Sequence, residues 1–540
     1  MPPLLPLIPQ PAEVHIQPGR LALDESLAIT CLDPDFLPEA GLLAERLRTA
    51  TGFPVPVETS DRASGGIVIR RENCVDAEAY RLDVDGRGCV LRAGSRAGIF
   101  RGAQTLLQLF PPAVFSRSPR DRIAWEIPFV CIADRPRFAW RGAMLDVSRH
   151  FATVEFLHRF LDAMAMHKLN VFHWHLTDDQ GWRIEIKKYP RLTGVGSRRR
   201  ETLFGHYNAA KGGDGIPHSG FYTQEEIRDV VEYAAARHIE VVPEVDMPGH
   251  MTAAIAAYPE LGCTGRPIEV GTKWGVIEDI LQPSEEAIGF CLDVLAEVVG
   301  LFPSKFIHLG GDEAVKTQWK NSPAIQEMIR NAGVANEEEM QGYFLGRMNQ
   351  FLIRSGRRMI GWDEILEGAT PEGAAIMSWR GEAGGVAAVR AGRDVIMAPN
   401  HSTYLDHYQS PNLEDEPLAI GGMVSLEKCY GYDPIAKELG RDEVDIILAH
   451  DNTHRIQAGP VELNPEEKAH ILGLQGQLWR EYLPGPENVE YMAFPRLCAL
   501  AEVGWSSPEK DFPGFLARLK AHLKRLDVIG LRYRALDPIE

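Results

Sequence analysis

The feature that most constrains the fold is an alternation of apolar, strand-like segments with amphipathic, helix-like segments from about residue 138 onward. Helical patterns occupy residues 154–169, 224–238, 285–302 and 337–356. The candidate strands are 142–148, 170–178, 239–248, 305–313, 358–364, 374–381, 394–400 and 470–479. Parallel neighbouring strands need crossover connections of this kind. Eight such units predict an α/β fold, a (β/α)₈ TIM barrel with insertions, better than an open doubly wound sheet.

The first part of the chain has a different pattern. Short strand-like segments at 66–70, 79–85 and 89–95 precede a helical pattern at 96–110, and this order is typical of a small α+β domain. Residues 111–122 contain Pro, Ser and Arg and are predicted to be a linker. We therefore expect a small α+β domain over residues 1–130 and the barrel over residues 131–540.

Charge and motifs exclude several classes of protein. Lys plus Arg number 57 and Asp plus Glu number 75, so the net charge is −18, which argues against nucleic acid or an anionic membrane as a partner. No apolar run approaches the roughly 20 residues of a membrane span. There is no CxxC pair, no GxGxxG after the first barrel strand and no GxxxxGK[ST]. We expect no metal and no cofactor.

The N-terminal residues lack the basic region and the continuous apolar core of a signal peptide. This predicts a cytoplasmic protein, with a secreted form whose signal has been removed as the alternative. A monomer or a homodimer is expected.

Polar and aromatic side chains occur at the ends of all eight candidate strands. In a barrel of this class the active site lies at the carboxyl ends of the strands, and tryptophans there are costly to leave exposed. We therefore expect a functional cleft at this end of the barrel. Its candidate residues are Asp146, Arg149, His173, His175, Asp178, Asp179, Glu244, Asp246, His250, Asp312, Glu313, Trp362, Asp363, Glu364, Trp379, Arg380, Asn400, His401, Tyr404, Asp406, Trp479 and Glu481.

This mixture of side chains suits carbohydrate chemistry, and the segment FIHLGGDE (306–313) supplies two adjacent carboxylates. Glycoside hydrolysis needs a carboxylic acid that protonates the leaving oxygen. Asp312 or Glu313 fits this role, because a like-charged neighbour and partial burial raise a carboxyl pKa.

Consecutive residues in an extended chain point to opposite sides. Asp312 and Glu313 are therefore poorly placed to face each other at the roughly 5 Å separation of retaining carboxylate pairs. A nucleophile could come from another strand end, and the spacing leaves the mechanism open. The candidates are Asp178, Asp246, Glu364 and Asp406.

Longer motifs resemble glycoside hydrolase family 20, the β-N-acetylhexosaminidases. They are LDVSRHF (145–151), HWHLTDDQGWR (173–183), PEVDMPGH (243–250), HLGGDE (308–313), GWDE (361–364), YLD (404–406) and LWREY (478–482). The resemblance extends over essentially the whole chain. It implies an exo-acting, retaining enzyme that releases terminal β-linked GlcNAc or GalNAc from oligosaccharides.

The resemblance also implies substrate-assisted catalysis, in which the substrate's 2-acetamido oxygen attacks the anomeric carbon and forms an oxazolinium intermediate. Glu313 would be the general acid and then the base. Asp312 would accept a hydrogen bond from the acetamido N–H, and Tyr404 would hold the acetamido oxygen.

The remaining site residues are implied by the same resemblance. Trp362, Trp379 and Trp479 would wall the pocket. Arg149 would bind the 3- and 4-hydroxyls, and Asp406 and Glu481 would bind the 4- and 6-hydroxyls. Asp178 and His250 would form a hydrogen-bonded network behind Glu313.

Two alternatives remain. His173 and His175 resemble the HxH of metal-dependent barrel hydrolases, although hydrogen bonding within the core is the favoured interpretation. A non-catalytic carbohydrate-binding barrel would keep the tryptophans but would not need Asp312 and Glu313. The glycine-rich segment 205–220 is predicted to be a mobile loop near the cleft.

Overall fold

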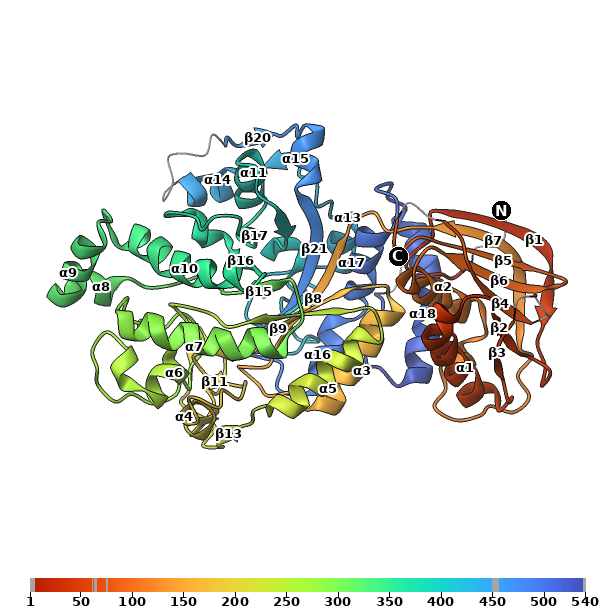
Figure 1. Ribbon diagram of the computed structural model, residues 1–540, viewed down its shortest axis with the longest axis horizontal. Coiled ribbons are helices and arrows are strands. Elements are labelled where there is room, and N and C mark those ends of the chain that lie inside the picture. Colours follow the sequence, from red (N-terminus) through yellow and green to blue (C-terminus); the bar gives the residue numbers. More distant parts are fainter. Residues whose placement is uncertain (1–4, 61, 63–65, 74–75, 449–455, 538–540) are drawn as a thin grey trace.

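The computed structural model describes residues 5–60, 62, 66–73, 76–448 and 456–537 (Figure 1). Eight parallel strands close into a barrel in the order β14-β15-β16-β17-β18-β21-β8-β9. They are β8 (Trp140–Asp146), β9 (Val171–His175), β14 (Glu240–Glu244), β15 (Phe306–His308), β16 (Arg358–Trp362), β17 (Ala375–Ser378), β18 (Val395–Met397) and β21 (Ile471–Leu478). The predicted (β/α)₈ barrel is confirmed.

The strands end earlier than the apolar patterns suggested, most clearly at β15. The pattern predicted a strand over 305–313, but β15 ends at His308. Gly310 and Gly311 have φ angles of +62° and +95°, in the left-handed region that glycine adopts readily and a strand does not use. The chain therefore turns out of the barrel before it reaches Asp312.

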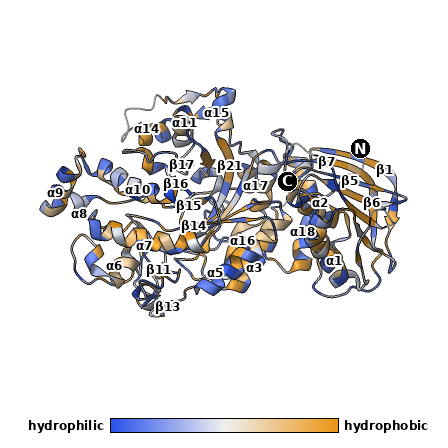
Figure 2. Cartoon of the chain, in the orientation of Figure 1, coloured by the Kyte–Doolittle hydropathy of each residue, from blue (hydrophilic) through white to orange (hydrophobic). Residues whose placement is uncertain are grey.

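The barrel helices begin at side-chain caps. They include α3 (Val154–Met166), α5 (Gln224–Ala235), α7 (Glu285–Leu301) and α10 (Glu337–Arg354), all of which the periodicity predicted. Thr153, Thr223, Ser284 and Asn336 each accept a hydrogen bond from the N–H three residues further on, which satisfies a donor that the helix itself leaves free. Figure 2 shows apolar residues along the barrel strands and mixed polarity on the surrounding helices.

The first domain contains a seven-stranded sheet in the order β1-β7-β5-β6-β4-β2-β3. Its strands are β1 (Glu13–Ala22), β2 (Ile29–Cys31), β3 (Val57–Thr59), β4 (Ile67–Arg71), β5 (Tyr80–Asp85), β6 (Gly88–Ala93) and β7 (Glu126–Asp134). Its two α-helices are α1 (Leu37–Thr51) and α2 (Arg96–Leu109). Strand β7 crosses the expected boundary at residue 130, because its pairing with β1 and β5 continues to Ala133 and Asp134.

The predicted linker is packed rather than free, since Val114 and Phe115 are buried within a 3₁₀ turn. Figure 1 shows α1 and α2 between the sheet and the barrel, beside α18 (Phe512–Ile529). Buried ion pairs join the two domains: the Lys168 ammonium lies 2.8 Å from Asp134. No helix within the described ranges has the length and apolar character of a membrane-spanning segment.

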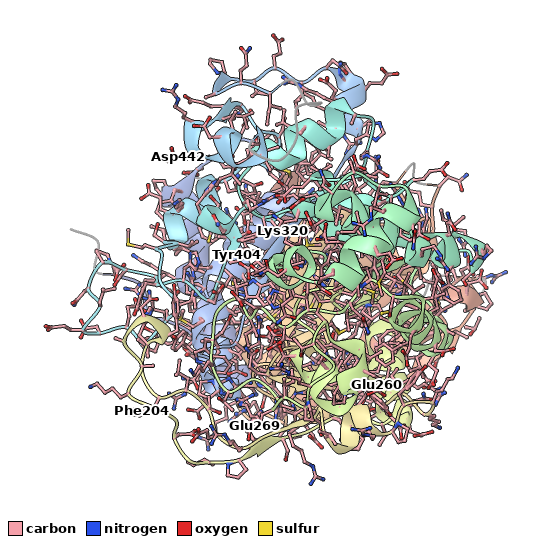
Figure 3. All side chains as sticks on the ribbon, turned by 90° about the vertical axis from the view of Figure 1, so that its left-hand side faces the viewer. Phe204, Glu260, Glu269, Lys320, Tyr404 and Asp442 are labelled. Atoms are coloured by element: carbon pink, nitrogen blue, oxygen red, sulfur yellow. The ribbon has the colours of Figure 1, made fainter. Side chains whose placement is uncertain are left out.

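Four long connections, after β9, β14, β15 and β18, lie at the carboxyl end of the barrel and build its mouth. They carry β10 (Thr177–Asp178), β11 (Gly181–Trp182), β12 (Arg198–Arg199), β13 (His218–Ser219), α6 (Thr252–Ala257), α8 (Thr317–Asn321) and α12 (Asn400–Thr403). In Figure 3 Tyr404 lies near the middle of the face seen, and Phe204 lies at its edge.

Candidate active site

A chain of polar groups runs from Asp178 through His250 to Glu313. His250 Nδ1 lies 3.2 Å from Asp178 Oδ1 and 3.2 Å from Asp179 Oδ2. Its Nε2 lies 3.5 Å from Glu313 Oε2. The His250 side chain is 5% exposed and that of Glu313 is 35% exposed, so this series of polar groups leads from the interior to the open mouth. The structure therefore brings these three predicted site residues together.

Asp312 approaches the same imidazole. Its Oδ2 also lies 3.5 Å from His250 Nε2. The expectation that adjacency sends the two carboxylates to opposite sides is wrong, because the extended geometry that it assumes is absent: Glu313 has a φ of +48°. Asp312 and Glu313 therefore both approach the same nitrogen of His250.

The two carboxyls differ in acidity. Burial and the charge of Asp246 raise the pKa of Asp312 well above its ordinary value. Burial also acts to raise the pKa of Glu313, but the hydrogen bond and charge of His250 outweigh burial and hold this pKa below its ordinary value. The raised pKa expected from the sequence is found at Asp312 and not at Glu313.

His250 holds the proton that Glu313 lacks. Burial alone would lower the pKa of His250, but the charge and hydrogen bond of Asp178 raise it well above the ordinary value. Asp178 stays ionised because Arg149, 2.7 Å away, and His250 overcome the effect of burial on its pKa. His250 and Glu313 thus form a coupled pair that carries one proton near neutral pH.

Four aromatic rings lie together at the mouth. The Trp362 and Trp479 rings are 5.8 Å apart, Trp479 and Tyr404 6.4 Å, and Tyr404 and Trp379 6.1 Å between centroids. Trp362 is 1% exposed and forms the inner end of this group. The structure places the predicted Trp379 and Trp479 beside Tyr404, and Trp362 beside Trp479, as a pocket wall requires.

A polar corner lies next to Trp479. The Arg149 guanidinium lies 5.1 Å from the Trp479 ring centroid and 3.8 Å from Glu481 Oε1. Asp406 is buried, its Oδ1 has no hydrogen-bond partner among the described residues, and burial with the charge of Glu481 raises its pKa. An unpartnered buried oxygen of this kind is available to a hydroxyl donor.

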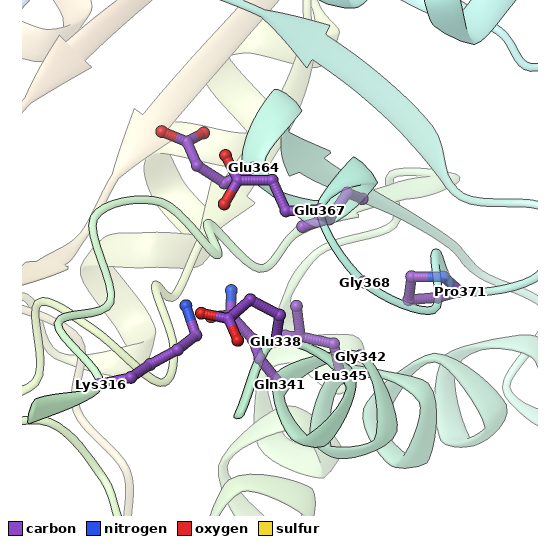
Figure 4. Close-up of a pocket in the computed structure, with 10 residues that line it drawn as sticks. Lys316, Glu338, Gln341, Gly342, Leu345, Glu364, Glu367, Gly368 and Pro371 are labelled. Carbon is purple, nitrogen blue, oxygen red and sulfur yellow. The ribbon is translucent and has the colours of Figure 1, made fainter. Parts of the chain in front are cut away.

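Trp379 is held from behind by Glu364, whose Oε2 accepts a hydrogen bond of 2.9 Å from the indole N–H. Behind Glu364 lies a small polar pocket, in which Glu364 and Glu367 face Lys316, Glu338 and Gln341 (Figure 4). The pocket holds about 10 Å³, enough for about one water molecule, so it is no sugar subsite.

The histidines of strand β9 point into the barrel interior. His173 Nε2 lies 3.0 Å from Glu244 Oε2, and His175 Nδ1 contacts the same oxygen. Glu244 Oε1 accepts a hydrogen bond of 2.9 Å from the Trp362 indole and lies 2.9 Å from His308 Nδ1. The favoured interpretation of His173 and His175 as hydrogen-bonded core residues is confirmed.

Sequence reasoning missed the groups that position the predicted ones. Gln180 is not among the candidate residues, yet its Oε1 accepts a hydrogen bond of 2.8 Å from Arg149 Nε. Asp146, a candidate without an assigned role, has its Oδ2 3.2 Å from another guanidinium nitrogen. Asp246 was considered only as a nucleophile. Asp246 and His250 both lie in the connection that follows β14, and both approach Asp312.

The segment 205–220 lies at the rim beside this corner. The Tyr207 N–H donates a hydrogen bond of 2.8 Å to the Tyr482 hydroxyl, and the Tyr482 ring lies 6.4 Å from that of Trp274. The predicted position near the cleft is therefore correct. The segment 205–220 is therefore tied to Tyr482, the residue that follows Glu481.

Known proteins share this architecture. The model of glycosyl hydrolase family 20, catalytic domain, matches residues 138–508, and that of its domain 2 matches residues 4–135. A β-hexosaminidase of Porphyromonas gingivalis is 42% identical over 534 residues, which cover 98% of this chain and 64% of that protein. The chain therefore spans less than two thirds of this relative.

Solved structures agree in fold. The family 20 β-N-acetylhexosaminidase of Streptomyces coelicolor superimposes with a TM-score of 0.83 at 32% identity, over 99% of both chains. A mutant Streptomyces plicatus β-hexosaminidase in complex with its product GlcNAc gives a TM-score of 0.82 at 33% identity, over 99% of this chain and 97% of that one. With the barrel, the site geometry and both family models in agreement, the chain belongs to glycosyl hydrolase family 20.

Proposed function

We propose that this protein is an exo-acting, retaining β-N-acetylhexosaminidase that releases terminal GlcNAc or GalNAc with the help of the substrate's own acetamido group. The observation that carries the proposal is that Asp312 and Glu313 both approach His250 Nε2, at 3.5 Å each. Glu313, 35% exposed, reaches the leaving oxygen and later a water molecule. Asp312, buried beside Tyr404, is available to the acetamido N–H.

A nucleophile that comes from the substrate is supported by the contacts of the other mouth carboxylates, each of which is held by a neighbouring group or lies outside the His250 cluster. Asp178 is paired with Arg149, Asp246 accepts the Gly311 N–H, and Glu364 accepts the Trp379 indole N–H. Asp406, the fourth candidate, belongs to the corner of Glu481 and not to the His250 cluster. Charge that develops on the acetamido group then meets the Asp312 carboxylate in a buried site, where it is stabilised most.

Exo action follows from the closed corner. Arg149, Asp406 and Glu481 would bind the hydroxyls of the terminal sugar. The Tyr482 ring, on the residue after Glu481, packs against Trp274, and we infer that this pair blocks extension of the sugar chain beyond the corner. A sugar bound here would therefore be the non-reducing end of an oligosaccharide.

The test compares two chromogenic substrates, p-nitrophenyl N-acetyl-β-glucosaminide and p-nitrophenyl β-glucoside, each with and without a chelator. We expect hydrolysis of the first only, unchanged by the chelator. Equal rates on both substrates would contradict the substrate-assisted mechanism, because the glucoside lacks the acetamido group. Loss of activity in the chelator would support a metal-dependent hydrolase, and no activity on either would support a binding protein.

A further inference from the structure

Two neighbouring buried carboxyl groups in the site each have an oxygen without a partner. Asp246 Oδ2 and Asp312 Oδ1 make no hydrogen bond to any described residue. One side-chain nitrogen or oxygen atom from each of Asp246, His250 and Asp312 lies within 4.8 Å of the other two. Asp246 is 1% and Asp312 7% exposed. Buried carboxylate oxygens are normally paired, so an unpartnered oxygen on each of two neighbouring carboxyl groups needs an explanation.

The backbone fixes Asp246 in this position. Its Oδ1 accepts a hydrogen bond of 3.0 Å from the Gly311 N–H. Its own backbone N–H donates a hydrogen bond of 3.2 Å to Thr177 Oγ1. A Cβ on Gly310 would lie 1.8 Å from Asp246 Oδ1, so only glycine allows the chain to pass this close. The turn that carries Asp312 is therefore wrapped around the Asp246 carboxyl group.

The surroundings favour one proton on this pair. The titratable groups that face it are Glu244, His250, Glu313, Glu364 and Tyr404. His250 is the one cation among them, and it is shared with Asp178 and Glu313. Burial raises the pKa of both carboxyls against the opposing effect of His250, that of Asp246 to about 7 and that of Asp312 well above its ordinary value. Two adjacent buried carboxyls do not both ionise readily.

We propose that Asp246 and Asp312 share one proton, and that Asp246 keeps it when Asp312 faces the substrate. The Asp246 hydroxyl then donates to Asp312 Oδ1 and fixes the orientation of that carboxylate. Asp312 Oδ2 remains free to accept the acetamido N–H. Asp246 is thus a positioning residue that acts through Asp312, and this role rests on the proposed function.

The test uses Asp246→Asn, whose amide can donate to Asp312 but cannot titrate, and Asp246→Ala, which leaves the oxygen unpaired. At pH 6, kcat/KM for p-nitrophenyl N-acetyl-β-glucosaminide should stay within about tenfold of wild type in Asp246→Asn and fall roughly 100-fold in Asp246→Ala. Equal losses in both variants would overturn the proposal.

Infrared difference spectra give a readout that a merely structural role would not move. At pH 6, wild type minus Asp246→Asn should contain the band of a protonated carboxyl group, and it should fade as the pH rises through about 7. Absence of the band would overturn the proposal. If Asp246→Asn does not fold, titration of the wild type alone is the test. Loss of the band as the pH rises through about 7 would support the proposal, and an unchanged band would overturn it. Failure of the proposed function would appear separately, in the wild-type assay on the glucoside.

Discussion

Two clusters of histidines and carboxylates lie in the barrel, one in its interior and one at its mouth. In the interior cluster, Glu244 accepts a hydrogen bond from the Trp362 indole and contacts nitrogen atoms of His173, His175 and His308, and every member is fully buried. In the mouth cluster, Asp312 Oδ1 and Asp246 Oδ2 are unpartnered and Glu313 is partly exposed.

This difference separates a cluster that stabilises the barrel from a cluster that can bind substrate. A fully buried network of this kind, closed to solvent, stabilises one arrangement of the strands that contribute to it. A cluster that keeps free oxygens loses stability but can receive a substrate. The same residue types, a few residues apart along β9 and β14, therefore serve two purposes.

The largest expected effect is at Glu313, the exposed member of the mouth cluster. Glu313→Gln removes the acid and the base, so kcat/KM for p-nitrophenyl N-acetyl-β-glucosaminide should fall by about 10²- to 10⁴-fold. The loss should be smaller for substrates with more acidic leaving groups. An equal loss across leaving groups would contradict acid catalysis by Glu313.

The next effect is at Asp312. Asp312→Asn keeps the shape but removes the negative charge that stabilises the cationic intermediate, so kcat should fall by about 10²- to 10³-fold. Steady-state kinetics on the same substrate measure this. Near-normal turnover in this variant would show that Asp312 belongs with the structural residues.

A smaller, pH-dependent effect is expected at His250. In the wild type the His250–Glu313 pair keeps its proton up to the raised pKa of His250, which sets the alkaline limit of activity. In His250→Asn the proton is held by Glu313 alone. The alkaline limb of kcat/KM should therefore move to lower pH, with about tenfold loss for each pH unit above it. A limb that stays in place would disprove the coupling.

The smallest effect is at Glu364, which holds Trp379 from outside the pocket. Glu364→Leu leaves the indole N–H without its acceptor, so KM should rise roughly tenfold with little change in stability. The matched variant Glu364→Gln keeps an acceptor and should behave like wild type. A similar rise of KM in both variants would mean that charge, and not the hydrogen bond, is what Glu364 supplies.

The sequence predicts the barrel and the position of its site because both depend on local patterns. Strand and helix periodicity places Asp312 and Glu313 at the end of the fourth barrel strand, and the structure brings them to the mouth. In the first domain the periodicity reveals β4, β5, β6 and α2. It does not reveal β1, because this strand contains Pro18 and Gly19 and is largely exposed.

Local sequence patterns could not predict which of the site's side chains carry a proton. It depends on contacts between loops that follow different strands, such as Asp178 with His250 and Asp246 with Gly311. The positive φ angles of His250 and Glu313 also leave no periodic signal. The cytoplasmic location and the oligomeric state stay predictions.

The most direct test of the division between the clusters is the urea midpoint of unfolding for two matched variants, Glu244→Gln and Glu313→Gln. The first breaks a buried charge network and should cost about 3–5 kcal/mol of stability. The second changes a partly exposed group and should change stability by less than about 1 kcal/mol. That contrast is the predicted result. Equal shifts of the midpoint in the two variants would contradict the separation of a structural interior from a catalytic mouth.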